Sequence, residues 1–260
     1  MKKYIIITLI LVFYPLLFLI SQTNPKGFMV TYYGVLSDKP FQEIDVANDG
    51  YEYLLLSNLK EGIFKTGRQV SVDEPVRFFY RHKLKKNETL YTFPEKKISA
   101  LKLDAFGETL WRNFPSEDRI IKWEIDKNIT RDIAGYTCYL ARGIYFLGKD
   151  DRTGRPRQIR ITAWFTPELP YPFGPYVYKD LPGLVLAAGT PSYYYVASNV
   201  KLLDIAPNVP RPHTRILTSD EYFNKISEIT KRKFGFDIME KYRKFNDSIK
   251  RANKTKKPTD

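Results

Sequence analysis

The residues of this chain that could act as a nucleophile, a general base or a metal ligand are few. Cys138 is the only cysteine, and His82 and His213 are the only two histidines. A cysteine hydrolase would need the Cys138 thiol within hydrogen-bond reach of an imidazole, and the two histidines lie in different regions of the sequence. Cys138 shares one side of a strand-like stretch with Tyr136 and Leu140, which favours a small buried apolar side chain. We predict a structural role for Cys138 and keep a cysteine hydrolase as the alternative.

The spacing of potential ligand residues along the chain does not indicate a metal or cofactor site. The chain has no C-x-x-C, no H-x-x-x-H and no clustered carboxylates, so a zinc or iron site is not indicated. It also lacks the G-x-S-x-G elbow of serine hydrolases. Asp126 with the adjacent pair Asp150 and Asp151 could bind calcium loosely, but neighbouring acids at a hairpin tip are typically solvated. We expect no metal, no cofactor and no catalytic residue.

The stretch from Ala163 to Ala187 is the most closely specified part of the chain. It holds five prolines, two glycines and six aromatic residues between two strand-like segments. Proline fixes the backbone angle φ and removes a backbone donor, so we expect an extended, polyproline-like path. Pro182 and Gly183 match the second and third positions of a type II turn. Gly174-Pro175 predicts another turn.

This stretch has two interpretations. It could be a crossover that closes one end of a sheet, with its aromatic rings in the core. Alternatively, it could form an aromatic groove or ridge for a ligand or partner. The residues that would form such a surface are Trp164, Tyr171, Phe173, Gly174, Pro175, Leu181, Pro182 and Gly183.

The elements that must position these residues read mostly as strands. Segments rich in Tyr, Phe, Val, Ile and Thr recur between turn residues, without helices between them, which predicts antiparallel β structure. The predicted strands are Phe28–Leu36, Tyr51–Leu56, Val76–Tyr80, Ile120–Ile125, Gly135–Leu147, Arg157–Phe165 and Tyr193–Leu203. We expect a mainly β fold, an antiparallel sheet curved toward a half-barrel or sandwich. Register and strand order are not readable from the sequence, so an open sheet and a closed barrel both remain possible.

The chain changes character after about residue 206. Prolines mark a connector over 207–217, and Thr218 with Glu221 reads as a capping box that begins a helix. Gly235 can end that helix, and a second amphipathic helix follows. We expect both helices to dock on the β domain, with a membrane-surface position as the alternative.

The N-terminus predicts export. Lys2 and Lys3 precede an apolar run from Tyr4 to Ile20, which is the pattern of a secretory signal. Pro15 within the run disfavours a regular membrane-spanning helix. We expect cleavage near Gln22, with a retained N-terminal anchor as the alternative.

The formal charge of +13 is concentrated at the C-terminus. The segment Lys225–Lys257 holds 12 Lys and Arg against 4 Asp and Glu. Such a charge attracts anionic lipid headgroups or an acidic partner, although it also suits the solvated face of ordinary helices. No nucleic-acid-binding motif is present. The predicted partners are an outer-membrane protein or an anionic membrane surface, met by the basic C-terminal helices.

One motif resembles a known family. Residues 180–185 read DLPGLV, and the preceding blocks IAGYTC at 133–138, AWFT at 163–166 and GPY at 174–176 stand in the same order. This arrangement is similar to the GLPGLI family of exported bacterial proteins, over about residues 28–205. Asp180 stands where the family has its first glycine. The resemblance implies export in a bacterium with an outer membrane and a β-rich fold, and it supplies no mechanism because the family has no established biochemical activity.

These observations give the following organisation and function. We expect a signal peptide at 1–22, a β-rich domain at 23–206, the connector at 207–217, a helical segment at 218–253 and a tail at 254–260. The predicted function is that of an exported envelope protein of the periplasm or outer membrane, which binds a partner or an amphiphile without catalysis. A peptidase-like hydrolase and a periplasmic carrier of hydrophobic cargo are the alternatives.

Overall fold

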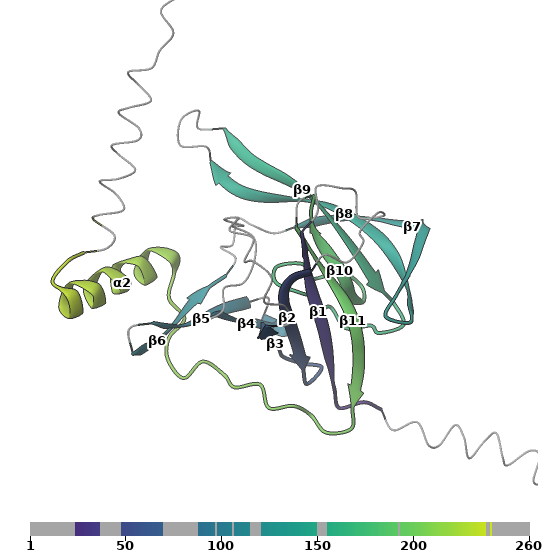
Figure 1. Ribbon diagram of the computed structural model, residues 1–260, viewed down its shortest axis with the longest axis horizontal. Coiled ribbons are helices and arrows are strands. Elements are labelled where there is room, and N and C mark those ends of the chain that lie inside the picture. Colours follow the sequence, from purple (N-terminus) through teal and green to yellow (C-terminus); the bar gives the residue numbers. More distant parts are fainter. Residues whose placement is uncertain are drawn as a thin grey trace, which may run out of the picture.

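One antiparallel sheet forms the body of the molecule. The computed structural model describes residues 24–36, 48–69, 88–96, 98–105, 107–114, 121–149, 155–191, 193–237 and 240. Within them, eleven strands follow the order β6-β5-β4-β3-β2-β1-β11-β10-β9-β8-β7 (Figure 1). The strands are β1 (Gly27–Leu36), β2 (Asn48–Ser57), β3 (Gly62–Gln69), β4 (Glu88–Phe93), β5 (Ile98–Ala105), β6 (Glu108–Asn113), β7 (Lys122–Ile133), β8 (Tyr136–Lys149), β9 (Pro156–Thr166), β10 (Leu184–Thr190) and β11 (Tyr193–Leu203).

The topology joins two meanders. Consecutive strands pair from β1 to β6 and again from β7 to β11, and β1 pairs with β11 to unite the two runs. The sheet is not closed, because β6 and β7 lie at its two edges. The prediction of a mainly antiparallel β fold is confirmed, and the choice between open sheet and closed barrel is settled as an open sheet.

One register row shows how the core is built. Val30, Leu55, Phe64, Leu90 and Leu101 lie opposite one another across β1 to β5. All five side chains are buried. Side chains alternate between the faces of a strand, so this row defines one buried face, which we call the inner face. Large apolar side chains from five neighbouring strands therefore form one continuous buried layer.

Several strands were not predicted from the sequence, and β10 shows why. All seven of its residues are buried, so it has no polar side to alternate with an apolar one. Strands covered on both faces lose the period-2 signal. The six-residue strands β4 and β6 were also not predicted. The strand predicted at Val76–Tyr80 lies outside the described residues.

The chain after β11 covers the β6 end of the sheet. Val209 of the connector packs with Ile63, Tyr91 and Trp111 on the outer face, opposite the inner one. Leu217 then extends the edge, since its backbone exchanges hydrogen bonds with Trp111 and Asn113 of β6. The β6 edge is therefore covered by the chain itself.

Helix α2 (Ser219–Phe234) follows at once. The Thr218 side chain accepts a hydrogen bond from the Glu221 backbone, and the Glu221 carboxylate accepts one from the Thr218 backbone. Gly235, with φ of 71°, ends the helix in the left-handed conformation. The predicted capping box and C-terminal glycine are both confirmed. Tyr222 and Ile229 pack the helix against Leu110 of β6.

Two predicted segments fall on residues that are not described. The apolar N-terminal run and its cleavage point precede residue 24, and most of the second C-terminal helix follows residue 237. Among the described residues, no helix is long and apolar enough to cross a membrane.

Candidate functional site

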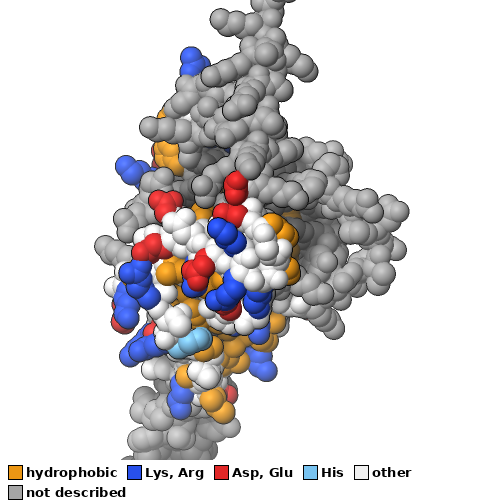
Figure 2. All heavy atoms as spheres, turned by 90° about the vertical axis from the view of Figure 1, so that its left-hand side faces the viewer, with side chains coloured by type: hydrophobic (Ala, Val, Ile, Leu, Met, Phe, Trp, Pro, Cys, Tyr) orange, Lys and Arg blue, Asp and Glu red, His pale blue; other side chains and the backbone are white. Residues whose placement is uncertain are grey.

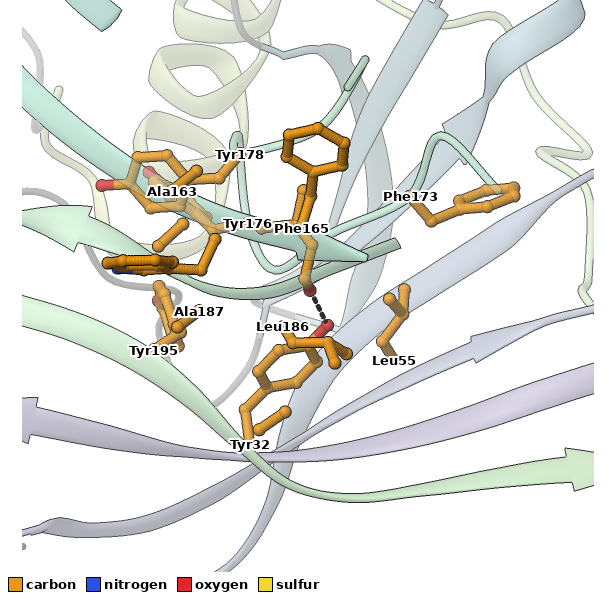
Figure 3. Close-up of a cluster of buried hydrophobic side chains, with 14 of the residues drawn as sticks. Tyr32, Leu55, Ala163, Phe165, Phe173, Tyr176, Tyr178, Leu186, Ala187 and Tyr195 are labelled. Atoms are coloured by element: carbon orange, nitrogen blue, oxygen red, sulfur yellow. Dashed lines mark hydrogen bonds between the residues drawn. The ribbon is translucent and has the colours of Figure 1, made fainter. Parts of the chain in front are cut away.

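Residues 167–183, which we call the lid segment, cross the inner face between β9 and β10. Phe173 and Tyr171 pack on Phe28 of β1, with ring centroids 5.7 and 5.3 Å away. Tyr176 and Tyr178 both contact Tyr195 of β11 (Figure 3). Backbone bonds anchor the segment to β10: Leu184 N–H donates to Leu169 O, and Val185 N–H donates to Phe173 O.

The lid segment also reaches the β7 end of the sheet. The Trp123 indole Nε1 donates a hydrogen bond of 2.9 Å to the Lys179 carbonyl. At the other end, Tyr176 packs on Phe114, with ring centroids 5.4 Å apart. The segment therefore spans the inner face and fills it with aromatic rings.

The predicted surface residues lie mostly inside the molecule. Trp164, Phe173 and Leu181 are exposed by only 4%, 1% and 2%. Gly174, Pro175 and Gly183 are also buried, Tyr171 is half-buried and Pro182 is exposed. The structure thus brings the lid residues together as core packing, which corresponds to the crossover interpretation. Trp164 is on β9 and is not part of the lid segment.

The prolines shape the lid differently from the predicted polyproline path. Tyr171 N–H donates to Leu169 O, and Phe173 N–H donates to Tyr171 O, each bond spanning one proline. Gly183 N–H donates to Leu181 O across Pro182 in the same way. A bond from residue i to i+2 closes a γ-turn, and the inverse form has a central φ near −75°, close to the value that proline imposes. The lid is therefore built from three proline-centred γ-turns.

This geometry corrects the predicted type II turn. The third position of such a turn needs a positive φ, and Gly183 does not have one. Gly183 is required for space instead, because a Cβ there would lie 2.1 Å from the Thr166 carbonyl oxygen. Gly174 is equally crowded, with the Tyr178 carbonyl oxygen 1.9 Å from the position of a Cβ. The two glycines let the lid lie directly on neighbouring backbone.

The positive backbone angle falls on Asp180, whose φ is 66°. The resemblance to the GLPGLI motif places a glycine at this position, and the backbone here has the conformation that favours glycine. Aspartate tolerates the left-handed region better than most residues. Its carboxylate forms an ion pair with Lys179, at 3.0 Å.

The candidate nucleophile lies in a poor setting for catalysis. Cys138 is fully buried, and its thiol donates a long bond of 3.5 Å to the Tyr136 carbonyl. Burial, and to a smaller extent the nearby carboxylates of Asp132 and Glu168, raise the pKa of Cys138 to about 12. A reactive cysteine needs a lowered pKa and an accessible thiolate.

The imidazole that could activate this thiol is elsewhere. His213 is exposed and packs edge-on against Trp111 of β6, 6.3 Å between ring centroids. Cys138 on β8 belongs to a different buried cluster, and β8 stands almost at the opposite end of the strand order. His82 lies outside the described residues. The structure does not bring Cys138 and His213 together.

Buried tyrosine hydroxyls form hydrogen bonds within the inner core. The Tyr32 hydroxyl donates a 2.6 Å bond to the Val185 carbonyl, and the Tyr193 hydroxyl donates to that of Tyr53 at 3.1 Å (Figure 3 draws the first). Burial raises the pKa of Tyr32 and of Tyr178 well above the ordinary value. The Tyr32 hydroxyl therefore stays protonated and acts as a structural donor.

A shallow open depression of about 480 Å³ lies on β7. The strand bulges there between Asp126 and Thr130, where the register with β8 shifts. The Asp126 carboxylate accepts bonds from the Asn128 backbone and the Arg142 guanidinium, at 3.1 and 3.4 Å. Asp150 and Asp151, the other two residues of the predicted loose calcium site, lie outside the described residues, so that alternative stays a prediction. No metal-binding group of three acidic, His or Cys residues occurs among the described residues.

The C-terminal end of α2 combines charge with exposed aromatic rings. Lys231, Arg232 and Lys233 occupy its last turn. Phe234 and Phe236 follow, 52% and 47% exposed, with ring centroids 5.9 Å apart. Figure 2 looks onto this side of the molecule and shows charged side chains around exposed apolar atoms. We call these five residues the helix-end patch. The sequence predicted the basic character of this segment. It did not predict that Phe234 and Phe236 lie next to each other at its end.

Comparison with known families gives one match. A family model described as a protein of unknown function, Porph_ging, matches residues 143–187. This range runs from β8 to β10 and contains the whole lid segment, so the match is compatible with a GLPGLI-type family. A search of curated proteins finds no match.

Comparison with solved structures supports the fold. The chain is similar to PNGF-II with a TM-score of 0.50 and 14% identity, over 78% of this chain and 34% of that one. The chain thus spans about a third of the length of PNGF-II. The Mycobacterium tuberculosis lipoprotein LppX is also matched, with a TM-score of 0.23 and 10% identity, over 67% of this chain and 86% of that one. At these identities the likeness to PNGF-II concerns the fold, and the score for LppX is too low to use.

Proposed function

We propose that this chain is an exported binding protein of the bacterial envelope, which meets its partner through its outer surface and not through an internal ligand site. The observation that carries the proposal is the filling of the inner face by the lid segment. A ligand carrier needs a concave, accessible pocket of several hundred cubic ångströms. Here the lid rings of Phe173, Tyr176 and Tyr178 occupy that position and are buried.

Two further observations support a binding role over a hydrolase. The buried Cys138 thiol has a pKa raised to about 12 and is not joined by His213. Accessible charged and aromatic side chains stand together at the end of α2, where Lys231, Arg232 and Lys233 precede the half-exposed Phe234 and Phe236. Export is supported by the basic N-terminus followed by an apolar run, and by the resemblance to an exported family.

The first experiment locates the protein and captures what touches it. Cells that express the full chain are fractionated, and the N-terminus of the protein is determined by mass spectrometry. The envelope fraction is then crosslinked, and the adducts are identified together with any lipid that co-purifies. Recovery in the envelope with a defined surface adduct supports the proposal.

Two results would overturn it. Retention in the cytoplasm removes the envelope assignment. A stoichiometric lipid that co-purifies with the protein and protects the lid segment from proteolysis would favour the carrier alternative, because such a ligand could enter only if the lid moved from the inner face.

A further inference from the structure

We infer that an extended acidic segment of a partner protein adds as a strand to the free edge of β9, along residues 156–161. The inference rests on the proposed function, since it names the surface and the kind of partner of an envelope binding protein. It starts from the unequal lengths of the strands at one end of the sheet.

The hairpin of β8 and β9 is longer than its neighbours. Residues 143–149 of β8 pair with residues 156–161 of β9. On one side β10 accompanies β9 only as far as Thr162, and on the other side β7 accompanies β8 only as far as Ile144. The hairpin therefore extends beyond the rest of the sheet, as Figure 1 shows, and we call residues 143–149 and 156–161 the arm.

The open edge of the arm belongs to β9. At about 3.4 Å per residue, residues 156–161 present roughly 20 Å of edge. Every second residue of an antiparallel strand directs its N–H and C=O to the same side, and among the described residues no backbone group pairs with this edge. An edge of this kind is a template for another strand. Because a two-stranded hairpin is only marginally stable in water, a third strand would also stabilise the arm.

Arginines line this edge on both of its faces. Arg160 shares one face with Gln158, and Arg157 shares the opposite face with Ile159, since side chains alternate along a strand. Both arginines are exposed, and neither forms an ion pair with another described residue. Residues 144–161 hold five Lys and Arg against two Asp, and both of the Asp lie outside the described residues. A strand that adds here meets positive charge on both faces.

The same charges disfavour a second copy of the chain at this edge. Two identical β9 edges would bring arginines together, and like charges across a strand pair are destabilising. Charged side chains and proline at an exposed edge protect against such self-pairing, and Pro156 begins β9. An acidic strand would instead convert the arginines into cross-strand ion pairs.

The arm also sets a residue pattern for its partner. In an antiparallel third strand, acidic residues would lie opposite Arg160 and Arg157, and an apolar residue opposite the half-buried Ile159. Read along the partner, the pattern is acidic, apolar, any residue, acidic. In strand addition the main-chain hydrogen bonds give affinity, and alternate side chains give specificity.

The test measures the fluorescence anisotropy of a labelled peptide, Thr-Glu-Val-Thr-Glu-Val-Thr, which contains this pattern, with the purified exported protein. We expect saturable binding at low salt that weakens at about 1 M salt, where the Debye length falls to about 3 Å. A peptide with lysine in place of each glutamate should not bind, because it meets the arginines with like charge.

N-methylated peptides separate strand pairing from charge attraction. Methyl groups on alternate backbone nitrogens remove the donors of one peptide edge and leave the side chains unchanged. Two such peptides are compared, one for each edge. We expect the peptide methylated on the edge that faces β9 to lose binding, and the other to keep it, because only one edge of the added strand makes main-chain hydrogen bonds.

Variants then locate the contact. Arg157→Gln with Arg160→Gln is expected to weaken peptide binding about tenfold, which is about 1.4 kcal/mol for two cross-strand charge pairs. The matched control, Lys65→Gln with Lys201→Gln, removes two exposed cations from β3 and β11 and should bind as the original chain does. Circular dichroism and melting curves establish that each variant is folded.

Four results would overturn the inference. One is the absence of binding by the acidic peptide at low salt. Equal binding by both N-methylated peptides would show charge attraction without strand pairing. Equal losses in the arginine and lysine variants would show that binding follows the overall charge. A dimer crosslinked through β9 would place a second copy at the edge.

The envelope crosslinking separates this inference from the proposed function. If the peptide does not bind and an adduct maps to another surface, the binding function stands and the arm is not the contact. If the peptide binds and the envelope yields no adduct, the arm accepts a strand and the envelope partner falls. If both experiments fail, the proposed function falls with the inference.

Discussion

Replacement of Gly183 by alanine tests why the lid has a glycine at this position. We argue that there is no room for a Cβ, and not that the backbone adopts a conformation that only glycine favours. The Cβ of the alanine would lie 2.1 Å from the Thr166 carbonyl oxygen, so it must move about 1.3 Å to reach the 3.4 Å of ordinary contact. The obstacle is the backbone of β9 and not a flexible side chain. Overpacking of this kind costs roughly 1–3 kcal/mol, and we expect the upper part of that range.

The unfolded chain offsets part of this cost. Alanine restricts the unfolded state more than glycine, which favours folding by about 0.4–1 kcal/mol. The expected net loss is therefore about 2 kcal/mol in the free energy of unfolding. For a domain of this size that corresponds to a fall in melting temperature of roughly 4–8 °C, at about 2–4 °C per kcal/mol.

The assay is urea titration and thermal melting followed by circular dichroism. The matched control is Gly135→Ala, since no atom lies within 4 Å of a Cβ there and the cost arises from its φ of 85° alone. We expect the control to lose about 1 kcal/mol from this strain. A Gly183→Ala variant as stable as the original chain, or less affected than the control, would refute the assignment of the lid to close backbone packing.

Three further predictions follow from the same core. Asp180→Gly should be more stable than Asp180→Ala by about 1 kcal/mol, because both remove the carboxylate and only alanine keeps a Cβ at a φ of 66°; equal melting curves would contradict this. Tyr32→Phe should cost about 1–3 kcal/mol by leaving the buried Val185 carbonyl without its donor, whereas Tyr33→Phe, on a half-buried side chain, should be nearly neutral in the same denaturation assay. Cys138 should resist alkylation in the folded protein and react after unfolding; because its folded pKa is raised to about 12, the unfolded thiol ionises first, so raising the pH above about 9 should lower stability more in the original chain than in Cys138→Ala, in which only the buried tyrosines would still contribute such a loss.

Local features of the sequence predicted the parts of the fold that depend on local interactions. The capping box of Thr218 and Glu221 and the terminal Gly235 were readable because their partners lie within four residues of one another. Strand β9 was readable because its residues alternate in polarity along the chain. Strand β10 was not, since it is buried on both faces and carries no alternation.

The candidate site shows the same division. The sequence singled out the proline-rich stretch correctly as a specified segment, and its burial followed from contacts with distant strands. Phe173 is buried because Phe28 lies beneath it, 145 positions earlier in the chain. The γ-turns were also missed, since proline permits both a polyproline path and a γ-turn, and only the contacts with β9 and β10 choose between them.

The amino-acid sequence by itself determined that the chain is mainly β, that a capped basic helix follows, and that one segment between two strands is rigid. These properties come from residue types and short spacings, which act before any long-range contact forms. The tertiary structure alone decided that the sheet is open, that the lid faces inward, and that Cys138 and His213 lie apart. Each of these depends on strand order and register, and those are selected by which apolar faces bury one another and not by any single segment.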